Sequence, residues 1–240
     1  MKMLVLVVLL VLISYIAYEC VRISKLVAKS RALVESSRSF QRTDGTFSML
    51  VIGDSTAVGV GGAPNDSLAA IVSTLIDASV QNLSKSGAVV ADARSQLTAG
   101  ERDRYDLILI QVGANNIIRL GSLQTASDGM DVLLQEARKH SDRVILLTSG
   151  KVGDAPLFPA FARFYFTKRA ENLRESFMKL AEKHDVQYVD LFSAADVFKT
   201  DPAKYYASDK FHPSGEGYRV WFEEVRKTIE KNWPELEHAE

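Results

Sequence analysis

Short apolar runs rich in β-branched residues alternate with longer amphipathic stretches from residue 48 onward, and this alternation constrains the fold most strongly. Two of the runs, residues 107–112 and 144–148, are almost continuously apolar, which is typical of strands covered on both faces. The order predicts an α/β fold with a mostly parallel five-stranded sheet and helices on both sides. Strands are expected near residues 49–52, 80–83, 107–112, 144–148 and 187–191, and helices near 67–78, 89–97, 125–139, 163–184 and 215–231.

The N-terminal segment has a different character. Residues 3–18 form an uncharged apolar run, preceded by Lys2 and followed by Glu19. Such a run is more apolar than a helix of a soluble domain requires, and an uncleaved signal anchor that crosses the membrane explains it best. A cleaved signal peptide would need a small-x-small site after the run, and a lipoprotein would need small residues before Cys20. Tyr18 and Glu19 occupy those positions, so both alternatives are disfavoured.

The charges around this run leave the side of the membrane open. Cations that follow the run favour a cytoplasmic body by the positive-inside rule, whereas a short positive N-terminus ahead of it favours export. We expect three parts in the chain. Residues 1–22 form the transmembrane anchor, residues 23–47 form a basic linker that is helical to about Ser36, and residues 48–240 form one globular domain.

Composition limits the partners of that domain. Residues 48–240 contain 22 Lys/Arg and 27 Asp/Glu, a net charge of −5, so electrostatics gives no reason to expect nucleic acid. Cys20 is the single cysteine of the chain, which excludes an intramolecular disulfide and a cysteine-based metal cluster. No His, Asp and Glu cluster has the spacing of metal ligands.

Polar, chemistry-bearing residues follow three of the expected strands, and a further set lies near the C-terminus. Carboxyl ends of parallel strands meet at one edge of a sheet, so these residues are expected to come together. Each short motif alone indicates only a turn or a helix cap. Together they supply the groups that acyl transfer requires. The residues are Ser55 in Gly-Asp-Ser, Gly87, Asn115 in Gly-Ala-Asn-Asn, and Asp209 and His212 in Asp-x-x-His-Pro.

A serine hydroxyl becomes a good nucleophile when a neighbouring base removes its proton, and histidine is the natural base near neutral pH. Among the four histidines, only His212 has an aspartate, Asp209, three residues earlier. His140 and His184 end expected helices, where helix capping explains them, and His238 lies in a polar tail. These observations make Ser55, His212 and Asp209 the candidate catalytic set.

A tetrahedral intermediate also needs hydrogen-bond donors for its oxyanion. The candidates are the Ser55 N–H, the Gly87 N–H and the side-chain amide of Asn115. Glycine suits this purpose because a side chain would hinder close approach to its backbone.

The four motifs, in this order, resemble those of the SGNH hydrolases, also called GDSL-type esterases and lipases, and in particular a bacterial esterase branch. The resemblance covers roughly residues 48–230 and maps the Ser, Gly, Asn and His of the family to Ser55, Gly87, Asn115 and His212. It implies a flavodoxin-like three-layer α/β/α sandwich and hydrolysis of carboxylic esters, with no metal or organic cofactor. The third motif of the family usually continues with Asp, and here Asn116 takes that place, which puts a supporting contact in doubt.

An aromatic stretch, residues 157–166, follows the fourth expected strand. One interpretation makes Phe158 and Phe161 part of an acyl-chain pocket or of a membrane-facing lip beside basic residues. The alternative is that these aromatic side chains form the core face of the following helix.

Three functions are compatible with these residues. The leading hypothesis is an esterase, lipase or lysophospholipase that acts on a small-molecule or lipid ester near the membrane. A carbohydrate O-deacetylase of the cell envelope would use the same fold and triad. A membrane-tethered binding domain that has lost catalysis is the third. The shape of the pocket decides among substrates, so the sequence leaves the substrate open, as it does the oligomeric state.

Overall fold

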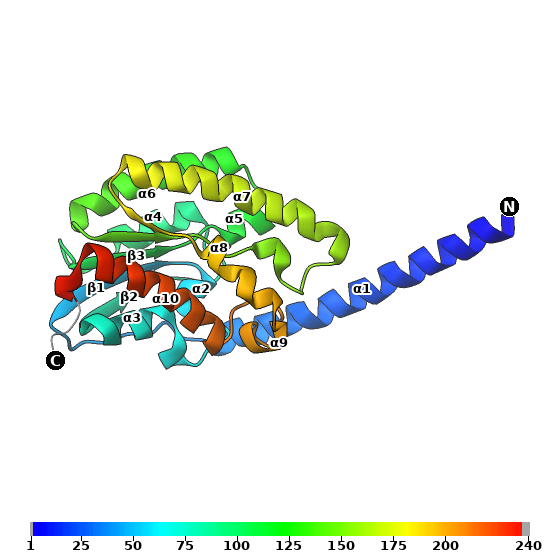
Figure 1. The fold of residues 1–240 in the computed structure, drawn as a ribbon, viewed down its shortest axis with the longest axis horizontal. Coiled ribbons are helices and arrows are strands. Elements are labelled where there is room, and N and C mark those ends of the chain that lie inside the picture. The colour runs from blue at the N-terminus through cyan, green and yellow to red at the C-terminus, as the bar shows by residue number, and fades with distance from the viewer. Residues whose placement is uncertain (1, 237–240) are drawn as a thin grey trace.

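The computed structural model describes residues 2–236, which contain one wholly parallel five-stranded sheet in the order β2-β1-β3-β4-β5 (Figure 1). His238 lies outside the described residues. In the central pair, Val51 of β1 is level with Leu109 of β3. Each strand coincides with an expected run to within a few residues, so the predicted α/β fold is confirmed. The strands are β1 (Phe47–Gly53), β2 (Ala78–Asn82), β3 (Leu107–Gln111), β4 (Val144–Leu147) and β5 (Gln187–Val189).

Alternate residues of the central strands enter two separate hydrophobic cores, one on each face of the sheet. In β3, Ile108 and Ile110 belong to one core, while Leu107 and Leu109 belong to the other. This follows from the two-residue period of a strand. Helices α4, α6 and α7 cover the first face, and α3 and α10 cover the second, which makes the three-layer sandwich visible in Figure 1. Their bounds are α3 (Leu68–Ile76), α4 (Val90–Thr98), α6 (Leu123–His140), α7 (Ala160–Lys183) and α10 (Gly215–Asn232).

Three of these helices begin with a serine that caps the first turn. The side chains of Ser67, Ser122 and Ser214 accept hydrogen bonds from backbone N–H groups at the starts of α3, α6 and α10. Each satisfies a donor that the helix cannot pair internally, which typically contributes about 1 kcal/mol.

Short helical turns follow the carboxyl ends of the strands and form the edge of the sheet where the candidate site lies. α2 (Ser55–Val58) follows β1, α5 (Ala114–Ile118) follows β3, and α8 (Leu191–Ala194) follows β5. The remaining short elements are α9 (Pro202–Tyr205) and the 3₁₀ turns Pro64–Asp66, Val152–Asp154, Ala195–Lys199 and Pro234–Leu236.

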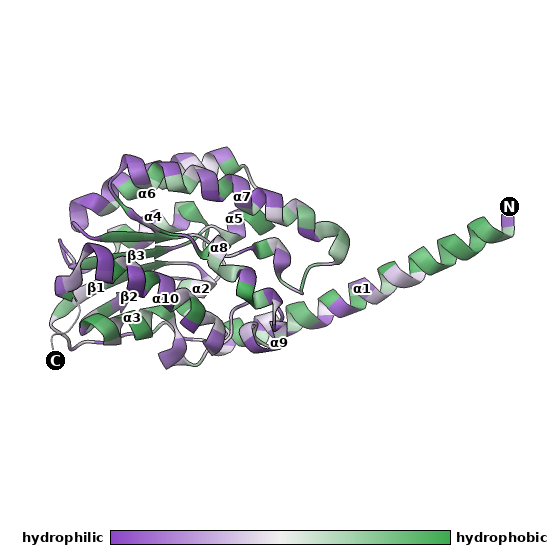
Figure 2. Cartoon of the chain, viewed as in Figure 1, coloured by the Kyte–Doolittle hydropathy of each residue, from purple (hydrophilic) through white to green (hydrophobic). Residues whose placement is uncertain are grey.

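The N-terminal helix, α1 (Lys2–Ser36), projects from the body as a single rod (Figure 1). None of its residues is buried, and it is long and apolar enough to cross a membrane, a property that a signal sequence shares. Its outer part is hydrophobic all round, as Figure 2 shows. The helix continues without interruption past residue 22, so the expected end of the anchor is not an end of the helix.

The segment between α1 and β1 is attached to the edge of the sheet. The backbone of Arg42 forms an antiparallel bridge with Val80 of β2, with N···O distances of 3.2 and 2.7 Å. The Gln41 side chain bonds to both backbone groups of Asn82. These contacts cover the open edge of β2, a position that proteins commonly protect from aggregation. The expected linker is therefore packed against the body over these residues.

Candidate active site

Ser55 lies in a sharp turn between β1 and α2. Gly53, which precedes it by two residues, has φ of +151°, and a Cβ there would lie 1.9 Å from the carbonyl oxygen of Gln111. Only glycine therefore allows the end of β1 to lie this close to β3. Gly59 then ends α2 in the left-handed conformation, with its N–H bonded to the Ser55 carbonyl. This local geometry holds the serine at the first residue of a helix, directly beyond the sheet edge.

Asp54 caps α2 from a fully enclosed position. Its carboxylate accepts hydrogen bonds from the backbone N–H and the hydroxyl of Thr56, at 3.0 and 2.8 Å. The residue is 1% exposed, and this burial raises the pKa of Asp54 despite the two bonds. Asp54 therefore shapes the serine turn and does not face the cavity.

Ser55, His212 and Asp209 form a continuous hydrogen-bonded line. His212 Nε2 lies 2.9 Å from Ser55 Oγ, and His212 Nδ1 lies 2.6 Å from Asp209 Oδ2. With the Nδ1 proton toward Asp209, Nε2 is free to accept the hydroxyl proton of Ser55. The three residues are 8%, 3% and 0% exposed, so little water competes for these bonds.

The histidine and the aspartate are oriented by one compact turn. The second carboxylate oxygen of Asp209 accepts hydrogen bonds from the backbone N–H groups of Phe211 and His212. Burial opposes ionisation of Asp209, but its hydrogen bonds, first of all the one with His212, outweigh that effect and lower its pKa. The Asp209 carboxylate is thus ionised at neutral pH and held against the imidazole. Lys210, within the same turn, has a positive φ of 59°.

Of the three oxyanion-hole candidates, Ser55 and Asn115 line the same cavity as His212. The Asn115 side-chain nitrogen donates one hydrogen bond to the Ala88 carbonyl at 3.0 Å. An amide nitrogen has two hydrogens, so this bond orients the side chain and leaves the other hydrogen for a ligand. Gly87 has φ of +85° and lines a separate hollow beyond β2, one residue before the carbonyl that orients Asn115.

Asn116, which replaces the aspartate of the resembling family, keeps a supporting contact. Its side-chain oxygen accepts a hydrogen bond from the Val90 N–H, at the first residue of α4, with a distance of 3.2 Å. A carboxylate oxygen would accept the same bond. The substitution therefore removes a charge but preserves the link between α5 and α4.

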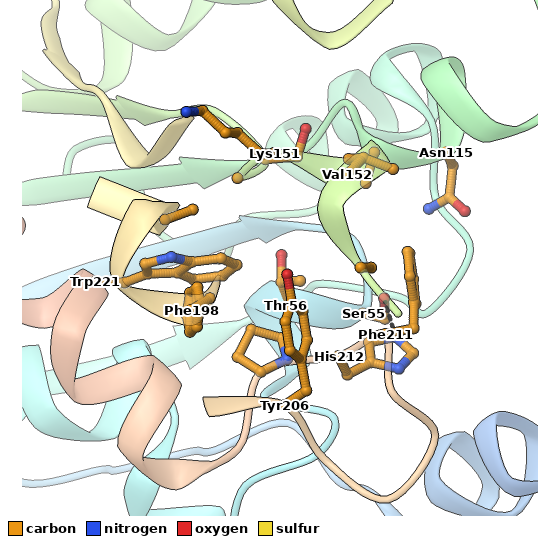
Figure 3. Close-up of a pocket in the computed structure, with 16 residues that line it drawn as sticks. Ser55, Thr56, Asn115, Lys151, Val152, Phe198, Tyr206, Phe211, His212 and Trp221 are labelled. Carbon is orange, nitrogen blue, oxygen red and sulfur yellow. Dashed lines mark hydrogen bonds between the residues drawn. The ribbon is translucent and has the colours of Figure 1, made fainter. Parts of the chain in front are cut away.

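The cavity beside Ser55 has a volume of about 50 Å³ and two different walls (Figure 3). We call Ser55, Asn115 and His212 the polar wall. We call Phe198, Tyr206 and Trp221 the aromatic wall. Phe198 belongs to the 3₁₀ turn Ala195–Lys199, Tyr206 directly follows α9, and Trp221 belongs to α10. The aromatic rings pack on one another, with centroids of Phe198 and Tyr206 5.3 Å apart and those of Phe198 and Trp221 6.0 Å apart.

Trp221 adds an indole N–H to the aromatic wall, in addition to the hydroxyl of Tyr206. It is 5% exposed, and within residues 2–236 its Nε1–H has no hydrogen-bond partner. A buried indole N–H normally finds an acceptor, so this unpaired donor is a candidate contact for a ligand bound beside Trp221. Sequence reasoning did not single out the aromatic wall or Lys151, which also lines the cavity. No local sequence motif distinguishes these residues. Aromatic residues in a sequence usually belong to the hydrophobic core, and a single lysine is usually a surface residue.

Neither Phe158 nor Phe161 lines the cavity. Phe158 is 8% exposed and packs against Phe166 and Phe211, with ring centroids 4.4 and 6.0 Å away. Phe211 does line the cavity, so Phe158 lies one ring behind it. Phe161 is 73% exposed at the start of α7. The two residues thus have different environments, one in the core and one at the surface.

The structure contains no group of three or more His, Cys, Asp or Glu side chains within residues 2–236 that could hold a metal ion. The other described histidines have local partners. His140 Nδ1 lies 2.9 Å from the Asp103 carbonyl, and His184 Nε2 lies 2.5 Å from Asp131 Oδ1. Both lie at helix ends, as expected from the sequence.

Comparison with known proteins gives a family match and a set of similar folds. The sequence model of the GDSL-like Lipase/Acylhydrolase family matches residues 51–220. No curated protein sequence matches the chain significantly.

Three solved structures illustrate the similar folds. A member of the lipolytic protein G-D-S-L family from Veillonella parvula has a TM-score of 0.64 at 14% identity, covering 76% of this chain and 97% of that one. TesA has a TM-score of 0.64 at 21% identity, covering 77% and 98%. A catalytic mutant of Axe2, an acetylxylan esterase from Geobacillus stearothermophilus, has a TM-score of 0.63 at 18% identity, covering 78% and 96%. At these identities the similarity establishes the fold.

Proposed function

Because the chain belongs to the GDSL-like lipase/acylhydrolase family, we propose that it is a serine hydrolase that cleaves carboxylic esters through Ser55, His212 and Asp209. The observation that carries this proposal is the unbroken hydrogen-bonded line from Asp209 through His212 to Ser55. A structural role alone would not require a buried serine, imidazole and carboxylate in this order.

In the proposed reaction, Ser55 Oγ attacks the ester carbonyl carbon while His212 Nε2 takes its proton. The carbonyl oxygen becomes an oxyanion, which would accept hydrogen bonds from Ser55 N–H, Gly87 N–H and Asn115 Nδ2–H. Collapse of this intermediate breaks the bond to the alcohol, which leaves with the proton from His212. Water, activated by the same imidazole, then attacks the acyl-enzyme and releases the acid. Asp209 holds the histidine tautomer and stabilises the imidazolium in both halves.

The small cavity favours short acyl groups. A volume of about 50 Å³ holds only a few water molecules, and hence an acyl group of roughly two to four carbons. Trp221 and Phe198 line its aromatic side, so a longer chain would have to leave toward the open side. This observation supports the second candidate function, O-deacetylation of a carbohydrate, which is the activity type stated for Axe2 among the similar structures.

We further propose that residues 1–22 anchor the protein in a membrane, that residues 23–47 connect the anchor, and that residues 48–240 form the hydrolase domain. The length and apolar character of α1 support the anchor. The substrate would then be an ester within reach of the membrane surface, either a lipid or an envelope carbohydrate.

Hydrolysis of p-nitrophenyl esters of increasing chain length by the full chain in detergent tests the function. Ser55→Ala is expected to lower turnover by roughly 10⁴-fold or more, and the exposed control Ser36→Ala to have no effect. A preference for acetate over octanoate would favour the deacetylase, and the reverse a lipid esterase. If a folded wild-type protein neither turns over these esters nor reacts with a fluorophosphonate probe, the catalytically silent binding domain is the better description.

A further inference from the structure

Exposed large apolar side chains of the body concentrate in one place. Outside α1, six such side chains are exposed among the described residues, and four of them lie at the N-terminal end of α7 or in the loop before α6. We call these four the aromatic patch. Its members are Leu120, Phe161, Phe164 and Tyr165, with exposed fractions of 54%, 73%, 81% and 52%.

The aromatic patch is a continuous surface. Phe161, Phe164 and Tyr165 are spaced three and four residues apart, so they lie on one face of α7. Arg169 connects this face to the loop of Leu120, because it donates a 2.7 Å hydrogen bond to the Gly121 carbonyl and lies 6.0 Å from the Tyr165 ring. A monomeric soluble surface seldom gathers side chains of this size without a partner.

The charged residues at the start of α7, beside the aromatic patch, are all positive, as expected of a surface that contacts anionic groups. The first ten residues of α7, 160–169, contain Arg163, Lys168 and Arg169 and no Asp or Glu. Arg163, near the N-terminus of α7, opposes the helix dipole, and its side chain donates a 3.2 Å hydrogen bond to the Phe158 carbonyl. Lys168 forms a 3.0 Å ion pair with Glu171 but remains more than half exposed. Aromatic residues beside Lys and Arg are typical of helices that lie at a membrane interface.

The proposed anchor places the aromatic patch near the end of the apolar run. Arg22 donates hydrogen bonds of 2.7 and 3.1 Å to the carbonyls of Pro156 and Leu157, in the loop that leads into α7. Arg22 follows Tyr18, the last residue of the run, by four residues, about 6 Å along the helix axis. Figures 1 and 2 show α1 leaving the body on the side where α7 begins.

The short length of the apolar run, residues 3–18, also places the loop before α7 near the membrane surface. Residues 3–18 span about 24 Å as a helix, less than the roughly 30 Å of bilayer hydrocarbon. The bilayer must therefore thin or draw the flanking residues inward, which brings the loop at Pro156 and Leu157 to the level of the lipid headgroups.

We propose that the aromatic patch is a second membrane contact, seated in the headgroup region of a phospholipid bilayer beside α1. The proposal rests on the membrane anchorage proposed above. The bilayer would take up the exposed rings, and phosphate groups would face Arg163 and Lys168. Phe158 and Phe211 pack between this end of α7 and the cavity, so the contact brings the opening beside Ser55 close to the membrane surface. An ester presented at that surface would reach Ser55 without crossing open water.

Site-specific fluorescence in the full chain reconstituted into vesicles of phosphatidylcholine and phosphatidylglycerol tests this contact. Cys20 is the only cysteine, so a Cys20→Ser background accepts single labelling sites. Phe164→Cys probes the patch, and Met178→Cys, an exposed position further along the same helix, is the matched control. We expect an environment-sensitive dye at position 164 to shift to the blue and to be quenched by lipids brominated near the headgroup. The dye at position 178 should do neither.

Equal, unquenched emission at positions 164 and 178 would overturn the proposal. A blue shift at position 164 that appears in detergent and grows with protein concentration would also overturn it, because it would indicate contact with a second copy. Val11→Cys reads the anchor separately, since quenching there depends on insertion of α1. Hydrolysis of p-nitrophenyl acetate by the same samples reports on the esterase proposal, so failure of one proposal is distinguishable from failure of another.

Discussion

The two walls of the cavity beside Ser55 are built in different ways. The polar wall is held by hydrogen bonds within and between short turns, such as the Asp209–His212 turn, where both partners lie three residues apart. The aromatic wall is held by ring packing among three side chains that lie between 8 and 23 residues apart in the chain, beyond the reach of a single turn motif. The polar wall has the geometry for bond breaking, and the aromatic wall limits which group fits beside it. Under the proposed function, chemistry and selectivity would thus belong to separable parts of the molecule.

Asp209→Asn is the most severe test of the polar wall. The amide would offer an N–H to His212 and favour the wrong tautomer, so kcat is expected to fall roughly 10⁴-fold. Steady-state hydrolysis of a short p-nitrophenyl ester measures this, with circular dichroism to confirm folding. Asp142→Asn, at an exposed ion pair with Arg104, is the control and should be unchanged. A tenfold effect or less at Asp209 would mean that the hydrogen-bonded line is structural.

Asn115→Asp tests whether the polar wall also binds the oxyanion. The change replaces donors with an anion and is expected to lower kcat/KM by roughly 10²–10³-fold. The neighbouring Asn116→Asp provides the contrast, because its oxygen still accepts from Val90 N–H and a charge at the start of α4 should raise stability by about 0.3–1 kcal/mol. Kinetics and urea unfolding of both variants separate the two roles. Similar kinetic losses in both would argue against an oxyanion contact specific to Asn115.

Trp221→Ala tests the aromatic wall. Removing the ring enlarges the cavity, so the ratio of kcat/KM for octanoate over acetate is expected to rise roughly 10–200-fold. The change also costs about 3–5 kcal/mol of stability, so assays belong well below the unfolding temperature. Trp221→Phe keeps an aromatic ring but lacks the N–H, so its kinetics measure the contribution of that donor alone. A chain-length profile that neither variant alters would show that the acyl group binds elsewhere.

Asp54→Asn tests the support beneath the polar wall, and its effect is on stability. Burial raises the pKa of Asp54, so the folded protein keeps a proton that the unfolded chain releases above its ordinary value of 3.8. Wild-type stability therefore falls as pH rises from that value toward the raised pKa. Asparagine cannot ionise and can still accept from Thr56, so the variant should gain stability relative to wild type across this window. Urea unfolding at several pH values measures the difference, and a difference independent of pH would contradict the assignment.

The polar wall could be predicted from the sequence because its features are local. Few backbone conformations are possible for a Gly-Asp-Ser turn that follows a strand. The same is true of an aspartate that contacts a histidine three residues later. The parallel order of strands then brings their carboxyl ends to one edge. Gly87 is less local, because its proposed place as an oxyanion donor depends on the loop after β2, which the hydrogen bond from Asn115 to the Ala88 carbonyl joins to the polar wall.

The sequence by itself determined the α/β order, the apolar N-terminal run and the family motifs, since hydrophobic periodicity and turn residues act over a few neighbouring positions. Only the tertiary structure decided that Phe198, Tyr206 and Trp221 meet opposite Ser55. It also decided that Phe158 is buried while Phe161, three residues later, is exposed. Such outcomes depend on how helices pack over the sheet. That packing sums many weak contacts between distant residues, so no short stretch of sequence contains it.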